Sequence, residues 1–455
     1  MKDTKSSFGS KFGAILAAAG SAVGLGNVWR FPTEAGEHGG SAFILIYIAF
    51  ALFMGVPIMV TELAIGRHGG DNVSHSFLKM SGGNKAWGLM GWLPVVAGIL
   101  VLSYYSVVAG WTFDYLCQSL VNGFAGKNAE QFIADFNGFA SSPFEPLICL
   151  FVLMALTCAI VACGVQGGIE RASRIMMPLL FACIAILVVC SLSLPGFADG
   201  FSFLFRPDFS KVDGPAVLSA MGQSFFSLSV GICCICTYGC YFRKDVNLMK
   251  DSISVASIDT MVAIMSGLII FPAVFSVPGL APDAGPSLVF ITLPNVFQQV
   301  FAGAPVLAYV FSVLFYILLL LAALTSSVSM LEMSAAIFVN KFNIRRPVAC
   351  IAISILCFGL GALCSLSFGC LGDVTIFGLT IFDFFDFVVA KFLMPIGALV
   401  ICIFAGWIVD KKVLHDELTN GGLVRQPLYG LYRFIIRYLA PICIAIIFIN
   451  GLNII

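Results

Sequence analysis

Apolar residues along the chain gather in long runs, and short polar segments separate these runs. A run of about 20 apolar residues is long enough to cross the hydrocarbon core of a bilayer as a helix. Barrel strands would instead alternate apolar and polar residues over about ten positions. The pattern therefore predicts eleven transmembrane helices, at residues 13–37, 41–66, 88–121, 144–163, 175–195, 215–241, 252–280, 304–339, 348–368, 374–408 and 438–454.

The composition is that of a membrane protein. Hydrophobic residues make up 60% of the 455 residues and charged residues only 11%, far from the averages of soluble domains. The segments between the spans are too short for a further folded domain. We therefore predict an all-α polytopic membrane protein with one domain, residues 1–455, in which the segment 281–303 forms a re-entrant or capping hairpin.

The distribution of positive charges predicts an orientation. If the N-terminus is placed inside and each span reverses the side, nineteen of the 24 Lys and Arg residues fall in inside segments and three in outside loops. Cytoplasmic loops carry such an excess of Lys and Arg, so we expect a cytoplasmic N-terminus and an external C-terminus. The start of the chain has no pattern of a cleavable signal, and the first span is expected to direct insertion.

Two spans have a polar centre interrupted by glycine. Residues 17–32 read AAAGSAVGLGNVWRFP, and residues 222–241 read GQSFFSLSVGICCICTYGCY. The two spans are five apart, and an odd offset reverses their direction through the bilayer. We therefore predict two inverted five-helix repeats, 13–195 and 215–408, with broken helices 1 and 6 and an extra helix at 438–454.

A simpler explanation of these glycines is close helix packing, which the spacing of Gly20 and Gly24 fits. It gives no reason to bury an amide and a guanidinium at Asn27 and Arg30. A break near residues 22–26 would free carbonyl groups for a cation, and the new helix start would offer N–H groups to an anion. Such a turn could bind both charges of a zwitterion together with a cation.

Other spans carry oxygen atoms that suit a hard cation such as sodium, by analogy with the oxygen ligands of calcium and magnesium. Ser227 lies in the sixth span, Asp259 in the seventh, and the adjacent Thr325 and Ser326 in the eighth. Hydroxyls in helices often bond their own i−4 carbonyl, which is the alternative role for each of them. A structural role is harder to assign to Asp259, because an ionised residue within a span costs about 2.5–3.5 kcal/mol on insertion scales.

Further polar residues of the spans suggest a gate and a ligand contact. Arg30 and Asp386 are expected on the outer side and could close a gate directly or through water. Tyr105 could donate its phenol hydroxyl to a carboxylate, although an interfacial or core tyrosine is the ordinary case. The other buried ionisable candidates, Glu62, Glu332 and Lys391, have no partner that the sequence identifies.

Seven segments match a known family: GSAVGLGNVWRFP at 20–32, GGSAFILIYI at 39–48, PIMVTELAIGR at 57–67, YYSVVAGW at 104–111, GQSFFSLSVG at 222–231, RKD at 243–245 and LTSS at 324–327. The chain resembles the neurotransmitter:sodium symporters, in particular their prokaryotic eleven-span amino-acid transporters. The match covers essentially the whole chain. It implies alternating access, driven by sodium, in the prokaryotic cytoplasmic (inner) membrane.

The resemblance also implies roles for particular residues. It places sodium ligands, for two ions, at Gly20, Ala22, Val23, Asn27, Ser227, Asp259, Ala322, Thr325 and Ser326. It places substrate contacts at Leu25, Gly26, Val101, Tyr105, Phe226, Ser229, Ile232 and Met330. The outer gate would combine Arg30 and Asp386 with Tyr105 and Phe226. No other cofactor and no nucleic acid is expected, and the partners are an amino acid, sodium and the lipid bilayer.

Some positions depart from the family pattern. Lys5 and Phe8 stand where an Arg and a Trp usually close the cytoplasmic side, and Asn340 stands where their Asp partner is expected. Asp259 occupies a position that is commonly Asn, while Ala263 replaces a residue that is Ser in chloride-dependent members. We hypothesise that Asp259 supplies the negative charge that chloride supplies in those members.

The sequence thus predicts sodium-coupled uptake of a neutral, hydrophobic or aromatic L-amino acid, independent of chloride. Proton-coupled amino-acid or amine uptake on the same fold is the alternative, with Asp259, Glu332 or Lys391 as the proton carrier. A channel would require a repeated ring of ligands around a pore. The chain instead has two broken helices, which fit an occluded site better. An enzyme is not expected, because the chain has no HExxH or Walker pattern and its four histidines lie outside the predicted spans or at their ends. The oligomeric state has no signal in the sequence.

Overall fold

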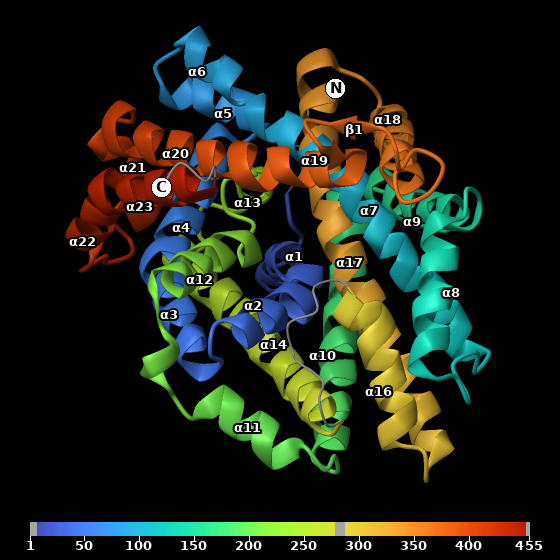
Figure 1. Ribbon diagram of the computed structural model, residues 1–455. Helices are drawn as coiled ribbons and strands as arrows, with labels where there is room; N and C mark the ends of the chain where they lie inside the picture. The colour runs from blue at the N-terminus through green and yellow to red at the C-terminus, as the bar shows by residue number, and fades with distance from the viewer. Residues whose placement is uncertain (1–6, 278–286, 452–455) are drawn as a thin grey trace.

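The computed structural model describes residues 7–277 and 287–451, and helices dominate it (Figure 1). Within these residues, nine helices are long and apolar enough to cross a membrane. Several of them combine consecutive helical elements. The nine are Ser41–Gly69, Lys85–Leu120, Glu145–Ala162, Val165–Ser191, Leu248–Phe275, Pro305–Phe342, Arg346–Leu366, Ile381–Ile408 and Tyr429–Gly451.

The first predicted span is a bent pair of helices. Helix α1 (Lys11–Ala22) is followed by the π-helical turn η1 (Gly26–Arg30) and α2 (Phe31–Glu37), and the two parts meet at a 55° bend. The sixth predicted span is divided into α12 (Gly214–Ser227) and α13 (Cys234–Gly239). The nine continuous spans and the bent first pair confirm the all-α polytopic fold, and the divided segment 214–239 corresponds to the remaining one of the eleven predicted spans.

The remaining elements have the following bounds. The second span consists of α3 (Ser41–Phe50), η2 (Ala51–Gly55) and α4 (Val56–Gly69), and the next contains α6 (Lys85–Met90) and α7 (Leu93–Leu120). They are followed by α9 (Glu145–Ala162), η3 (Val165–Glu170), α10 (Arg171–Ser191), α14 (Leu248–Phe275), α17 (Pro305–Phe342) and α18 (Arg346–Leu366). The last spans contain α19 (Ile381–Phe387), η6 (Val388–Leu393), α20 (Met394–Ile403) and η7 (Phe404–Ile408), then α22 (Tyr429–Phe434), η8 (Ile435–Leu439) and α23 (Ala440–Gly451).

Shorter helices connect the spans. They are α5 (Val73–Met80), α8 (Ala129–Ser141), α11 (Phe197–Phe205), the 3-10 turn η4 (Phe209–Lys211), η5 (Leu288–Thr292), α16 (Leu293–Val300) and α21 (Lys411–Thr419). The expected hairpin at 281–303 falls partly on residues outside the described ranges. Its described part, Leu288–Val300, is a short apolar helix.

Three predicted helix starts are wrong: the helices predicted to begin at residues 175 and 438 begin at Val165 and Tyr429, and a third begins later than predicted. The span predicted to begin at residue 374 begins at Ile381, because strands β1 (Thr375–Ile376) and β2 (Leu379–Thr380) form an antiparallel pair before it. Phe377 and Gly378 connect the strands with φ values of 53° and 81°, and two successive positive values are typical of a tight hairpin turn. The apolar composition of this segment concealed the turn.

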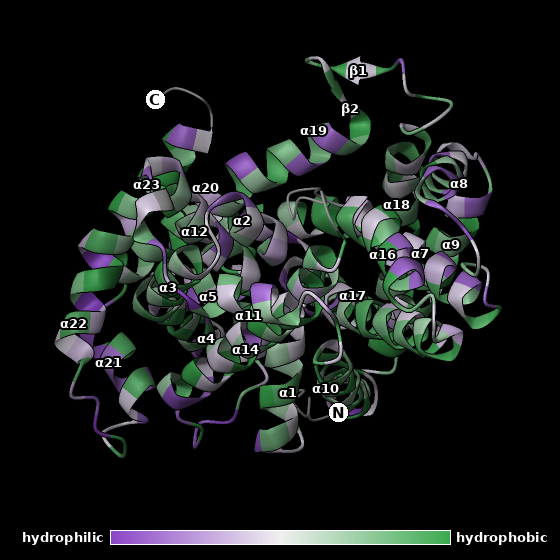
Figure 2. Ribbon diagram, turned by 60° about the horizontal axis from the view of Figure 1, so that its bottom comes forward, coloured by the Kyte–Doolittle hydropathy of each residue, from purple (hydrophilic) through white to green (hydrophobic). Residues whose placement is uncertain are grey.

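The two broken spans lie in the interior of the helix bundle. Helix α1 contacts α10, α14 and α17, and α17 runs along α7, which in turn contacts α9 and α18 (Figure 1). Peripheral helices carry hydrophobic residues on their outer faces (Figure 2). Exposed examples are Ile148 and Phe151 on α9 and Ile355 on α18. Large apolar side chains that face outward on most sides are what a lipid environment requires.

Candidate functional site

The break in the first span is fixed by glycines that approach other helices closely. Val23 leaves the helix with φ −68° and ψ 113°, and the freed Gly24 N–H donates to the Asn27 side-chain oxygen at 2.9 Å. A Cβ atom at Gly24 would lie 2.6 Å from the Ser326 hydroxyl oxygen, and one at Gly26 would lie 2.9 Å from the Phe226 ring. Backbone, hydroxyl and ring can therefore meet at this break only if both positions are glycine.

The break in the sixth span is held by a buried carboxylate. Residues 228–233 leave the helix, and three of them have positive φ: Ser229 (52°), Gly231 (92°) and Cys233 (63°). Glu62 on α4 accepts hydrogen bonds from the N–H groups of Gly231 (2.9 Å) and Cys236 (3.3 Å). The sequence offered no partner for Glu62. In the structure it satisfies two backbone donors that the break would otherwise leave buried and unpaired.

The two breaks meet in a buried polar cluster on one side. The Asn27 amide nitrogen donates to the Asp259 carboxylate at 2.7 Å and to the Ser227 hydroxyl at 3.0 Å. The Ser227 hydroxyl donates to the other Asp259 oxygen at 2.7 Å, and Tyr47 on α3 donates to the same oxygen at 3.1 Å. The structure thus brings three of the predicted sodium ligands together from three separate spans.

A second group of oxygen atoms lies on the α17 side of the first break. The hydroxyls of Ser326 and Thr325 approach the Val23 carbonyl oxygen at 3.1 and 3.4 Å. The Thr325 hydroxyl also donates to the Ala322 carbonyl at 3.0 Å, and Gly20 packs beside the Thr325 side chain. Ala22 is the last residue of α1 and directly precedes Val23. Hydroxyl and carbonyl oxygens are ligands that suit a hard cation.

The predicted substrate contacts surround the same breaks. The Leu25 N–H donates to the Tyr105 hydroxyl at 3.3 Å, and the Ser229 hydroxyl donates to the Ser21 carbonyl at 3.2 Å. Apolar contacts are expected from three further residues. Val101 on α7, Ile232 in the sixth-span break and Met330 on α17 are all buried.

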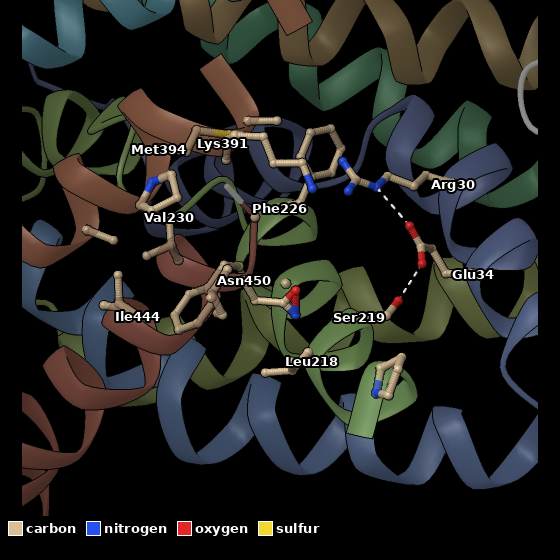
Figure 3. Close-up of a pocket in the computed structure, with 18 residues that line it drawn as sticks. Arg30, Glu34, Leu218, Ser219, Phe226, Val230, Lys391, Met394, Ile444 and Asn450 are labelled. Carbon is tan, nitrogen blue, oxygen red and sulfur yellow. Dashed lines mark hydrogen bonds and ion pairs between the residues drawn. The ribbon is translucent and has the colours of Figure 1, made fainter. Parts of the chain in front are cut away.

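On the predicted outer side, Arg30 lies over the Phe226 ring at 4.3 Å and pairs with Glu34, with 3.5 Å between Arg30 Nε and Glu34 Oε1. Ser219 donates to the other Glu34 oxygen (Figure 3). Asp386 lies beside the buried Tyr104 phenol. Within residues 7–277 and 287–451, no direct ion pair joins Arg30 to Asp386, so a gate formed by these two residues remains a prediction.

The sequence did not identify Tyr47 and Glu34 as site residues. Tyr47 has no sequence signal beyond a hydroxyl in an apolar span. Glu34 does have one, since it stands four residues after Arg30 and i,i+4 side chains meet on a helix.

The opposite end of the bundle contains a different set of contacts. Phe8 packs edge-on against Tyr238, Tyr241 and Phe242. The Asn340 amide donates to the Asp71 carbonyl at 2.9 Å, whereas Lys5 lies outside the described residues. The other unpaired acid of the sequence, Glu332, is bound by the Tyr241 hydroxyl at 2.5 Å and by the Arg346 guanidinium. A partly buried ion pair, Arg346–Glu332, therefore lies at this end, between residues that the sequence did not connect.

A further charged cluster joins α21 to the end of α4. Glu417 accepts from Arg67 Nε at 2.9 Å and from Lys244, and lies 3.1 Å from His68 Nδ1. Burial alone would raise the pKa of Glu417. The hydrogen bonds from His68 and Lys244 and the positive charges of Lys244 and Arg67 outweigh it and lower this pKa to about 2.

A helix bundle with two broken spans, whose polar groups meet at the breaks, defines a secondary transporter of the membrane. The sequence pattern of the sodium:neurotransmitter symporter family matches residues 5–135 and 131–455. The chain belongs to this family of sodium-dependent symporters.

Relatives support this assignment along the whole chain. The sodium-dependent transporter YhdH of Bacillus subtilis is 39% identical over 445 residues, which cover 98% of this chain and 97% of YhdH. A sodium-dependent transporter of Haemophilus influenzae is 31% identical over 464 residues, covering 98% of both chains. The crystal structure of MhsT in complex with L-phenylalanine is similar with a TM-score of 0.88 and 42% identity, over 98% of this chain and 99% of that one.

Proposed function

We propose that this protein takes up a neutral, hydrophobic or aromatic L-amino acid by sodium symport and alternating access, without a requirement for chloride. The observation that carries the proposal is the pair of oxygen clusters on either side of the first break. One contains Asn27, Ser227 and Asp259, and the other contains Val23 and Ser326. Each offers neutral or anionic oxygens to a cation, so two sodium ions would flank one substrate.

The substrate class is inferred from what surrounds the break. The Tyr105 hydroxyl and the Leu25 N–H, which now bond each other, would bind the carboxylate, with Gly26 beside them. Val101, Ile232 and Met330 would contact the side chain, while Phe226 and Ser229 would border the amine. The complex of MhsT with L-phenylalanine is in accord with an apolar substrate.

Charge balance supports independence from chloride. Asp259 is fully buried, and Asn27, Ser227 and Tyr47 all donate hydrogen bonds to its carboxylate. A fixed carboxylate at this place would balance the positive charge of the sodium ions, as a bound chloride would. Ala263, one turn further along α14, adds no hydroxyl that could bind chloride.

The full topology belongs to the same proposal. The segments 13–195 and 215–408 would form two inverted repeats, whose equivalent broken spans face each other across the substrate. Arg30 and Asp386 would close the outer side through a water or after a rearrangement of Arg30. The N-terminus would face the cytoplasm and the C-terminus the exterior of the inner membrane.

Uptake into proteoliposomes tests this function. Purified protein is reconstituted, and labelled neutral amino acids are offered with an inward sodium gradient, with potassium in its place, and with gluconate in place of chloride. We expect sodium-dependent uptake of apolar amino acids that gluconate leaves unchanged. Uptake driven by a pH gradient without sodium would contradict the proposal and favour proton coupling.

A further inference from the structure

Two π-helical turns pack against each other near the C-terminal end of the chain. They are η7 (Phe404–Ile408), which ends the span Ile381–Ile408, and η8 (Ile435–Leu439), which lies in the first half of the span Tyr429–Gly451. Gly406 allows the turns to approach closely, because a Cβ atom there would lie 3.1 Å from the Arg437 Cα atom. Such turns are rare and are frequent at functional sites.

The packing of these turns stacks the Arg437 guanidinium on aromatic rings. Its Cζ atom lies 4.0 Å from the centre of the Trp407 ring and 5.5 Å from that of the Tyr438 ring. The Trp407 indole N–H donates to the Arg437 carbonyl at 3.3 Å, which fixes the indole beside η8. Stacking of this kind uses the face of the guanidinium and leaves the N–H groups along its edge for an acceptor.

The guanidinium has no acidic partner within the protein. Among residues 7–277 and 287–451, no carboxylate forms an ion pair with Arg437, and the buried Nε atom of Arg437 has no hydrogen-bond acceptor there. An arginine brings five N–H donors, and a buried donor without an acceptor is destabilising. The charge is thus available to an anion from outside the chain.

The surface beside Arg437 is apolar. Exposed side chains flank Trp407 and Arg437 along both spans, and they are Ile403, Ile408, Phe434 and Leu439. Trp407 is the last residue but one of its span, and tryptophan is enriched where a helix reaches the membrane surface. Apolar chains and charged headgroups of the lipid meet at this level, so an anion with apolar chains would contact both the arginine and these side chains.

The neighbouring segment is basic. Between residues 404 and 440, five Lys and Arg residues stand against three acids, and one of these acids, Glu417, is bound in the charged cluster with Arg67. Lys411 and Lys412 begin α21 shortly after the end of the span. Basic residues next to the cytoplasmic leaflet attract anionic lipids.

We propose that Arg437 and Trp407 form a binding site for an anionic phospholipid, on the side of the membrane that we expect to be cytoplasmic. The lipid phosphate accepts hydrogen bonds from the guanidinium edge, and the acyl chains lie along the exposed apolar side chains of the two spans. The site is separate from the two breaks, and its occupation does not depend on the transport activity proposed above.

Quenching of tryptophan fluorescence by brominated lipids tests this site, because Trp407 is 54% exposed and reports on the lipid beside it. The full chain is placed in phosphatidylcholine nanodiscs, in which brominated phosphatidylglycerol or brominated phosphatidylcholine replaces an increasing share of the lipid. A Trp407→Phe variant gives the fluorescence of the other tryptophans, which is subtracted. We expect half-maximal quenching of Trp407 at an about fivefold lower share of the anionic lipid, because charged groups form the stronger hydrogen bonds.

Three variants assign the preference to the arginine. Arg437→Gln should bring the two quenching curves together. Arg437→Lys keeps the charge but loses the planar fork, so it should keep only part of the preference. Arg425→Gln, at an exposed arginine between α21 and α22, is the matched control and should keep all of it. Added salt should reduce the preference, because it screens the charge.

Two results would overturn the proposal. The first is equal quenching by the two brominated lipids in the unchanged protein, a comparison that does not depend on the folding of any arginine variant. The second is a preference that Arg437→Gln leaves intact, or that Arg425→Gln reduces as much, since the charge of the whole surface would then be responsible.

Discussion

At the scale of single residues, the charge of Asp259 is the feature that most constrains the mechanism. Its carboxylate accepts hydrogen bonds from Asn27, Ser227 and Tyr47, so both of its oxygens are held in place before any ion arrives. A hydrogen bond to a charged group contributes about 1.5–3 kcal/mol. Neutralising this one group would therefore change ion binding more than most substitutions in the bundle.

We predict that Asp259→Asn makes uptake dependent on chloride. The amide keeps the shape of the carboxylate but removes the negative charge, so uptake in gluconate should fall about tenfold or more. Chloride should restore part of it. Sodium-driven uptake in the two salts measures the effect, with Asp245→Asn as the control at an exposed acid that pairs with Arg243. Equal uptake of the Asp259 variant in both salts would count against the assignment.

Gly24 is the second residue at which the structure predicts the effect of a substitution on uptake. A methyl group at this position would meet the Ser326 hydroxyl oxygen at 2.6 Å, and overpacking of this kind costs about 1–3 kcal/mol. Gly24→Ala should therefore lower uptake about fivefold or more. Gly359→Ala, on α18 with open space around it, is the matched control and should keep normal uptake. Normal uptake by both variants would show that the site does not require glycine at position 24.

At the scale of elements, sequence reasoning located the two broken spans because their signals are local. Glycines, Asn27 and Arg30 stand out within an apolar run, and so does the SLSVG segment of the sixth span. The partners of these elements were not local. Glu62 binds the sixth-span break from a helix about 170 positions away, and Arg346 reaches Glu332 only because α17 and α18 turn back on each other. Such pairings depend on packing between spans, which a single sequence does not specify.

The attachment of α21 to α4 is an element-scale contact with a pH dependence. The pKa of Glu417 is lowered from 4.5 to about 2, so its carboxylate stabilises the folded state above pH 4.5 and loses this effect as the pH falls from 4.5 toward 2. We predict that Glu417→Gln lowers the melting temperature at pH 7. The difference from the unchanged protein should shrink below about pH 4.5.

Thermal melts of the two proteins between pH 3 and pH 7 check this expectation, within the lowest range that the detergent or lipid tolerates. Asp416→Asn, on the same helix with an exposed side chain, serves as the control. A difference in melting temperature that stays constant across the acid range would show that Glu417 acts through packing and not through its charge.

At the scale of the whole molecule, an odd number of spans places the two ends of the chain on opposite sides of the membrane. Nineteen of the 24 positive residues then fall on the side of the N-terminus, as expected for the cytoplasm. We predict that alkaline phosphatase fused to the C-terminus is active in an inner-membrane host, since it folds only outside the cytoplasm, and that a fluorescent protein fused there stays dark.

The reverse result, a dark phosphatase and a bright fluorescent protein, would place both ends inside and leave an even number of spans. The predicted span that does not cross the membrane would then be 215–241. Its two short helices are separated by six non-helical residues, and neither is long enough to cross a bilayer alone. The orientation experiment therefore tests the inverted repeat itself. If the broken sixth span does not cross the membrane, it cannot be the mirror of the first, and the substrate site between the two breaks would lose its symmetry.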